Sequence, residues 1–260
     1  MPGDLPEAAR DYGFAVDPGG THTSRTMMLA ELRLLLDACP ASAGYEDYRQ
    51  AIVDDNVLLK DTATTRLRTL RGLRELYALD RGVLLFRALR DLWDDSSTEQ
   101  SLLALLCASA RDPLLRVTAP TVLQVPPGAP VTPNMLAEAV GEHFPGHYNP
   151  AIVAKIGRNL ASSWQQAGHL HGRSHKLRSR ATPGPATTGY ALLLGHLCGS
   201  RGAGLFDTLW AKLLDVPAHA VQTHAIVASQ RGWIEYRHVG SVIEFSFRHL
   251  LRDEQRIGTA

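Results

Sequence analysis

The sequence NPAIVAKIGRNLASSWQQAGHLHGRSHKLRSR, residues 149–180, carries the clearest structural signal in the chain. Asn149 followed by Pro150 is typical of a helix start, because asparagine caps exposed N–H groups and proline fits the first turn. Gly168 marks the end of that helix. Residues 169–180 then predict a short strand, a Gly-Arg-Ser turn and a basic return strand. A helix followed by such a hairpin predicts a winged-helix unit.

The predicted helix has two faces when residues are placed about 100° apart. The apolar face consists of Ile152, Val153, Ile156, Leu160, Trp164 and Ala167, with Ser163 among them. The polar face consists of Lys155, Arg158, Asn159, Ser162, Gln165 and Gln166. It contains no carboxylate, and its amide and guanidinium groups match the edges of bases in a major groove. We therefore expect this helix to contact DNA.

Basic residues are concentrated around this helix, although the whole chain has a formal net charge of only +1. Residues 151–206 contain no aspartate or glutamate. They contain seven lysines and arginines: Lys155, Arg158, Arg173, Lys176, Arg178, Arg180 and Arg201. If about six of them met phosphates, log affinity would fall against log salt with a slope of about −5. The alternative is a solvated basic loop that only keeps the protein soluble.

Proline- and glycine-rich stretches divide the chain into predicted segments. Residues 117–133 contain several prolines, and we expect no helix to run through them. Residues 181–188 form a second boundary. The expected organisation is a flexible leader (1–23), a helical domain (24–125), two winged-helix units (131–182 and 186–250) and a tail (251–260). The expected fold class is therefore mainly α, with small β-hairpin wings.

Within the helical domain, residues 45–80 are compatible with a helix-turn-helix. Their second helix would turn leucines inward and direct Arg68 and Arg71 outward, while Arg66 lies closer to the leucine stripe. The other interpretation is an arginine-bearing surface helix packed on a bundle.

The second winged-helix unit follows the same order, with three helices and then two strands at 233–237 and 242–247. Asp215 is expected to cap its third helix. That helix would expose mostly uncharged residues, namely His219, Gln222, Thr223 and Gln230. Both DNA and protein contacts are open for this unit.

Cysteine usage and hydropathy indicate a cytoplasmic protein without a membrane span. Cys39, Cys107 and Cys198 are widely separated in apolar stretches, as expected for reduced thiols. The N-terminus lacks the pattern of a secretory signal. The densest apolar run, residues 102–107, is far shorter than the roughly 20 residues that a bilayer helix needs.

The sequence contains no complete metal-binding or catalytic motif. His169, His171 and His175 lie close together in the sequence, but no cysteine or carboxylate completes a zinc site beside them. The glycine-rich residues 199–204 lack the Gly-Lys-Ser/Thr ending of a phosphate-binding loop. No hydrolase, kinase or metalloprotease signature is present. We expect no enzyme activity, no cofactor and no bound metal.

Three stretches, in this order, resemble the BrxA family of bacterial BREX (bacteriophage exclusion) defence systems. They are SRTMMLAELRLLL (24–36), DDNVLLKDTATTRLRTLRGLRELYALD (54–80) and the Thr-Pro, Asn-Pro-Ala-Ile and Gly-His-Leu positions within 132–170. The resemblance implies an accessory DNA-binding component that works beside a methyltransferase, an ATPase and an alkaline-phosphatase-like protein. It also implies that DNA contacts lie in two basic tracts, 66–74 and 155–180.

The sequence therefore predicts a non-enzymatic, largely sequence-tolerant binder of double-stranded DNA, with other BREX proteins as partners. The predicted DNA-binding residues are Arg66, Arg68, Arg71, Lys155, Arg158, Asn159, Ser162, Gln165, Arg173, His175, Lys176, Arg178 and Arg180. Two alternatives remain. One is a winged-helix transcription regulator with an N-terminal dimerisation or sensing domain, and the other is a structural adaptor that does not bind DNA.

Overall fold

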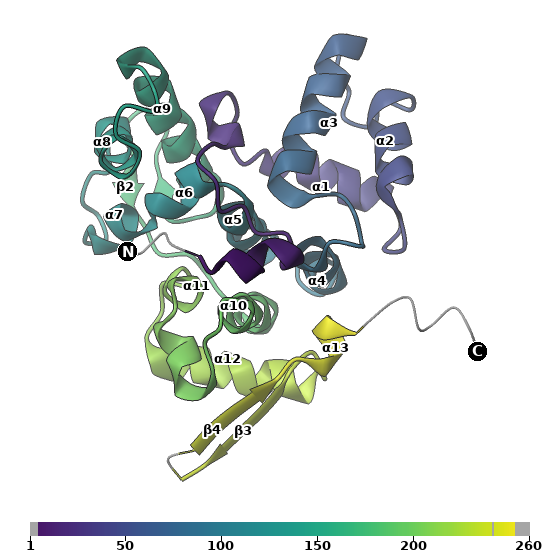
Figure 1. Ribbon diagram of the computed structural model, residues 1–260, viewed down its shortest axis with the longest axis vertical. Coiled ribbons are helices and arrows are strands. Elements are labelled where there is room, and N and C mark those ends of the chain that lie inside the picture. Colours follow the sequence, from purple (N-terminus) through teal and green to yellow (C-terminus); the bar gives the residue numbers. More distant parts are fainter. Residues whose placement is uncertain (1–4, 241, 253–260) are drawn as a thin grey trace.

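The computed structural model describes residues 5–240 and 242–252, and the described chain is mainly helical with two small antiparallel hairpins (Figure 1). The fold class expected from the sequence is confirmed. The predicted tail lies outside the described residues from position 253 onward. The N-terminal half contains α1 (Leu29–Ala38), α2 (Tyr45–Val53), α3 (Ala63–Tyr77), α4 (Leu84–Trp93) and α5 (Gln100–Arg111).

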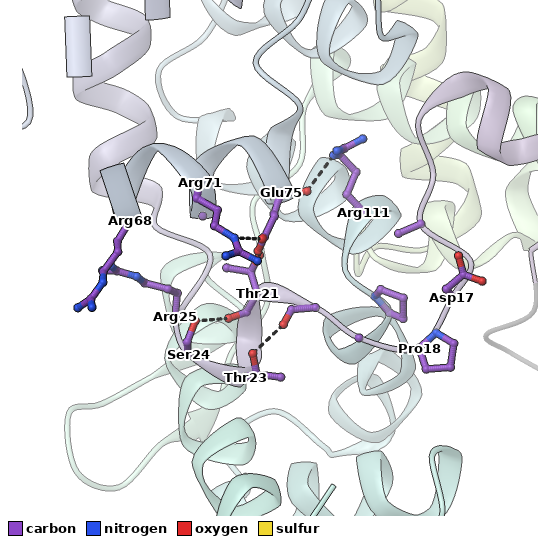
Figure 2. A pocket seen from close by; sticks show the side chains of 15 residues that line it. Asp17, Pro18, Thr21, Thr23, Ser24, Arg25, Arg68, Arg71, Glu75 and Arg111 are labelled. Carbon is purple, nitrogen blue, oxygen red and sulfur yellow. Dashed lines mark hydrogen bonds and ion pairs between the residues drawn. The ribbon is translucent and has the colours of Figure 1, made fainter. Parts of the chain in front are cut away.

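The leader was expected to be flexible, and for residues 5–23 this is wrong. They form two short 3₁₀ helices, η1 (Glu7–Tyr12) and η2 (Thr21–Thr23), and bury Ala9, Phe14 and His22. In Figure 2 the leader runs beside α3, where the Thr21 hydroxyl donates a hydrogen bond to Glu75. A segment with few apolar residues can pack on a core when its polar groups form hydrogen bonds with the rest of the chain. Composition alone does not show whether such hydrogen bonds exist.

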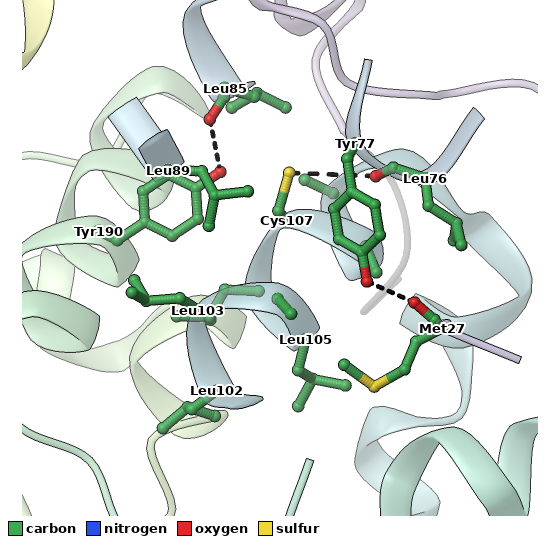
Figure 3. Close-up of a cluster of buried hydrophobic side chains, with 14 of the residues drawn as sticks. Met27, Leu76, Tyr77, Leu85, Leu89, Leu102, Leu103, Leu105, Cys107 and Tyr190 are labelled. Atoms are coloured by element: carbon green, nitrogen blue, oxygen red, sulfur yellow. Dashed lines mark hydrogen bonds between the residues drawn. The ribbon is translucent and has the colours of Figure 1, made fainter. Parts of the chain in front are cut away.

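Helix α5 lies at the centre of the fold, with residues 102–110 all buried. Two tyrosines from distant parts of the chain lie on either side of Cys107 of this helix (Figure 3). The Tyr77 hydroxyl donates to the Met27 carbonyl at 2.5 Å, and the Tyr190 hydroxyl donates to the Leu85 carbonyl at 2.9 Å. Burial raises the pKa of the nearby Cys107 thiol to about 11, so this thiol is protonated at neutral pH. The core is therefore continuous from the leader to α10.

Helices α2 and α3 pack together, but residues 54–62 connect them. That connection is longer than the roughly three to four residues of a helix-turn-helix. Helix α3 begins where the Thr62 hydroxyl accepts a hydrogen bond from the Thr65 N–H. The geometry matches the alternative interpretation of residues 45–80, a surface helix packed on a bundle.

The first part of the predicted linker is helical, contrary to expectation. Helix α7 (Ala119–Gln124) lies within the predicted linker, and α6 (Pro113–Val117) ends at its first residue. Their prolines stand in the first turn, where a missing N–H removes no helical hydrogen bond. Asp112 also caps α6 by accepting hydrogen bonds from the Leu114 and Leu115 N–H groups.

The first unit consists of α8 (Pro133–His143), α9 (Pro150–Gln166), β1 (Leu170–His171) and β2 (Leu177–Arg178). Strands β1 and β2 are antiparallel, with Leu170 opposite Arg178. The linker adds a third extended chain, since the Val131 N–H donates to the Lys176 carbonyl at 2.9 Å. Helices α8 and α9 approach closely at Gly157, where an added Cβ would lie 2.2 Å from the Pro133 carbonyl oxygen.

The second unit consists of α10 (Pro185–Leu197), η3 (Gly202–Asp207), α11 (Leu209–Lys212), α12 (Ala218–Gln230), β3 (Glu235–Val239), β4 (Val242–Ser246) and α13 (Arg248–Leu251). Helix α10 is buried along almost its whole length and packs on α12, α4 and α5. Asp215 does not cap the third helix as expected, because Pro217 holds the N-cap position of α12. The Asp215 carboxylate pairs with the first unit instead.

Candidate nucleic-acid interface

Helix α9 is positioned by its cap and by its apolar face. The Asn149 side chain accepts a hydrogen bond from the Ile152 N–H at 2.9 Å, as the sequence predicts for an N-cap. Ile156, Leu160 and Trp164 are fully buried against the rest of the unit. This fixes the opposite side of the helix toward solvent.

The predicted polar face of α9 is only partly exposed. Lys155, Arg158 and Gln165 are exposed, whereas Ser162 is half-buried and its hydroxyl donates to the Arg158 carbonyl at 3.1 Å. Asn159 is a correction to the predicted site. Its amide donates at 2.9 Å to the carbonyl of His22 in the leader, so it is not available to a base edge. The exposed stripe is therefore narrower than the helical projection suggested.

The first wing presents Arg173 and His175 to solvent. Its turn requires Gly172, whose φ is +97° and whose Cβ, if present, would lie 2.1 Å from the His175 carbonyl oxygen. Lys176 is half-buried, and its ammonium group donates to the Gln165 side chain on α9. This contact holds the wing beside the exposed stripe of α9. Burial lowers the pKa of Lys176.

Arg178 was predicted to bind DNA, and the structure contradicts this. The side chain is 2% exposed and forms an ion pair with Asp215 at 2.8 Å. Its remaining donors reach the Val122 carbonyl at 2.9 Å and the carbonyls of His169 and Ser179. Arg178 therefore joins the two units internally, and its burial keeps it away from a phosphate.

Four cations of the first unit remain exposed and form no ion pair with any carboxylate in residues 5–240 and 242–252. We call them the exposed cations: Lys155, Arg158, Arg173 and Arg180. Arg180 contrasts with Arg178, two residues earlier, because it lies at the surface.

The arginines of the second predicted tract, on α3, also differ in their exposure and in their partners. Arg66 is directed inward, where its guanidinium donates to the carbonyls of Val53 at 2.9 Å and Lys60 at 3.3 Å, so it does not belong to a DNA surface. Arg71 pairs with Glu75 at 2.9 Å. Arg68 is exposed and has no polar partner within the described part of the chain.

A cleft of about 890 Å³ lies between part of α3 and part of the leader, and Arg111 and Pro113 also line it. Figure 2 shows Arg68 and Arg71 on one wall and the leader, including Arg25, on the other. Sequence reasoning missed Arg25 and Arg111 as members of this site. Each is a lone arginine among apolar or small neighbours. The docking of the leader brings Arg25 to α3, and the packing of α5 on α3 brings Arg111 there.

A second constellation that the sequence did not indicate joins the leader to α5 and α9. His22 Nδ1 lies 2.7 Å from Asp112 Oδ2, and His22 Nε2 lies 2.8 Å from Ser163 Oγ. These are the residue types of a hydrolase triad. All three side chains are at most 1% exposed, and Ser163 Oγ also accepts a hydrogen bond from the Met27 N–H. An acyl substrate cannot reach Ser163 in this arrangement, so the three residues form a buried network that fixes the leader.

The histidines beside the first wing are spread between core and surface. His169 is buried, and its Nε2 hydrogen-bonds the Leu213 carbonyl at 2.9 Å, while His171 and His175 are exposed. Burial lowers the pKa of His169 to about 4, so this ring is neutral at physiological pH. Among the residues described, no three histidine, cysteine or acidic side chains are placed to hold a metal ion together.

None of the described helices combines the length and the apolar character needed to cross a membrane. Comparison with known proteins adds no assignment, since no family model matches the chain and no curated protein matches it.

Proposed function

We propose that this chain is a non-enzymatic, largely sequence-tolerant binder of double-stranded DNA and that the first unit makes the contact. The observation that carries the proposal is the set of four exposed cations on and beside α9, in a stretch without a carboxylate. Such cations attract the phosphate backbone, and residues 151–206 add no carboxylate to repel it. Gln165 and Arg158 supply donors that can reach base edges.

The number of available charges sets the expected salt dependence. Arg178 is internal and Lys176 is engaged with Gln165, so four cations remain for phosphate contacts. Each phosphate contact contributes about −0.9 to the slope of log affinity against log salt. The expected slope is therefore about −3.5, smaller than the value of about −5 estimated from the sequence alone.

The test is the affinity of a labelled duplex of mixed sequence, measured by fluorescence anisotropy at low salt. The quadruple variant K155E/R158E/R173E/R180E is expected to bind at least about 100-fold more weakly than the unmodified protein, because attraction becomes repulsion at four positions. Unchanged affinity of this variant would exclude the first unit as the DNA-binding surface.

A matched pair of neutralised variants provides the control. K155Q/R158Q removes two charges from α9, and K212Q/R237Q removes two exposed charges from the second unit. We expect the first variant to lower both the affinity and the salt slope, and the second to change neither by more than about twofold. Equal effects would indicate that only net charge matters.

The resemblance to the BrxA family supports placing this DNA binder in a cytoplasmic BREX defence assembly with other BREX proteins as partners. In a strain with a complete BREX cluster, replacing the gene by the quadruple variant is expected to abolish phage restriction while the protein remains present. The regulator alternative makes a different prediction, because an operator should outbind random DNA by about 10³-fold or more. Competition between genomic fragments and random duplex therefore separates the two.

A further inference from the structure

The cleft between the leader and α3 contains more positive than negative charge. Four arginines line it, namely Arg25, Arg68, Arg71 and Arg111, together with the carboxylates of Asp17 and Glu75. Both carboxylates are already paired. Asp17 binds the guanidinium of Arg10, at 2.5 and 2.7 Å, and Glu75 binds Arg71 at 2.9 Å.

The remaining arginines differ in what they can still bind. Arg111 is held by the carbonyls of Gly13, Glu75 and Arg74, which use its donors but leave its charge uncompensated. The side chains of Arg25 and Arg68 make no hydrogen bond or ion pair with any residue that the structure describes. Figure 2 shows Arg68 of α3 and Arg25 of the leader near each other at one end of the cleft, with Asp17 at the other end. Two guanidinium groups with free donors therefore face one cleft.

This arrangement favours a phosphate group as the ligand. Each guanidinium offers a planar fork of N–H donors that matches two oxygens of a phosphate. Two like charges in one cleft repel each other in the absence of a ligand, and a dianion relieves that repulsion. The leader wall adds room for the ligand, because a Cβ at Gly19 would meet nothing within 4 Å.

The shape of this cleft distinguishes it from the surface that carries the exposed cations of the first unit. A duplex lies across a convex or flat surface, whereas this cleft is a concave space of about 890 Å³ between two segments of chain. A nucleotide fits such a space, and pockets for small ligands have volumes of roughly 300–1,000 Å³. We propose that the cleft binds a phosphate group, supplied by a free nucleotide or by a DNA strand, between Arg25 and Arg68.

The test uses the full-length protein, with ADP, inorganic phosphate and adenosine as probes in isothermal titration calorimetry at low salt. ADP is expected to bind at one site and adenosine to show no binding. R68Q and R25Q are each expected to weaken ADP binding about tenfold or more, because each removes charge-assisted hydrogen bonds. Arg68 is exposed, so R68Q should fold normally, and the melting temperature of each variant checks this.

Two further variants show which molecule supplies the phosphate. They also separate a failure of this proposal from a failure of the proposed function. K155E/R158E/R173E/R180E should lose the duplex yet bind ADP as the unmodified protein does. K212Q, which removes an exposed charge outside the cleft, should change neither affinity. If ADP does not bind but R25Q/R68Q weakens duplex binding about tenfold, the phosphate belongs to DNA. If R25Q/R68Q changes neither the affinity for ADP nor the affinity for the duplex, the proposal is wrong.

Discussion

The two helix-and-hairpin units share an order of elements but differ in where their charges lie. In the first unit, four cations are exposed in a stretch without acidic residues. In the second hairpin, Arg237 lies directly opposite Glu244 in the strand register, and Arg248 lies 3.6 Å from Glu235. Opposite charges at such positions offset each other. The same scaffold can therefore present an unbalanced or a balanced surface, and the placement of carboxylates decides which.

The comparison is sharpest between two arginines of the first unit, since Arg178 is internal and Arg180 is exposed. Replacing Arg178 by methionine removes the partner of Asp215 and the donors to three carbonyls. Breaking a buried ion pair leaves an uncompensated charge, so we expect a loss of about 3 kcal/mol or more in the free energy of unfolding. Urea denaturation measures this loss.

The matched control is Arg180→Met, which should change the free energy of unfolding by less than about 0.5 kcal/mol because the side chain is at the surface. A loss below about 1 kcal/mol for Arg178→Met would show that the ion pair between the units contributes little to the free energy of unfolding.

The joint between the two units also predicts a dependence of stability on pH. His169 has a folded-state pKa of about 4, below the roughly 6.5 expected in the unfolded chain. Below about pH 6.5 His169 is therefore protonated in the unfolded chain but stays neutral in the folded protein. The free energy of unfolding falls as the pH falls toward about 4. At about pH 5 the expected loss is about 2 kcal/mol relative to about pH 7.5.

His169→Gln isolates this effect, because glutamine keeps a donor for the Leu213 carbonyl but does not titrate. Urea denaturation of both proteins at the two pH values gives the difference, and the fluorescence of the adjoining Trp164 reports it. Equal pH dependence in the two proteins would contradict the assignment of the effect to His169.

The sequence predicted those parts that local patterns specify. The cap at Asn149 and both hairpins follow from neighbouring residues, and the structure confirms them. The candidate site was predicted less well, because its composition depends on contacts between distant segments. Arg178 is internal because Asp215 of another unit reaches it, and Asn159 is occupied because the leader crosses α9. No periodicity of a single helix or strand contains that information.

The smallest expected effect concerns the second hairpin. The variant E235Q/E244Q removes its carboxylates and so makes its charge resemble that of the first wing. If only the first unit contacts DNA, the added attraction acts at a distance and is screened over about 8–10 Å. We therefore expect duplex affinity to rise by no more than about threefold. Fluorescence anisotropy with the same duplex measures the change, with R173Q in the first wing as the comparison of opposite sign. A rise of about tenfold or more would mean that the second hairpin also lies against DNA and that its carboxylates limit the affinity of the intact protein.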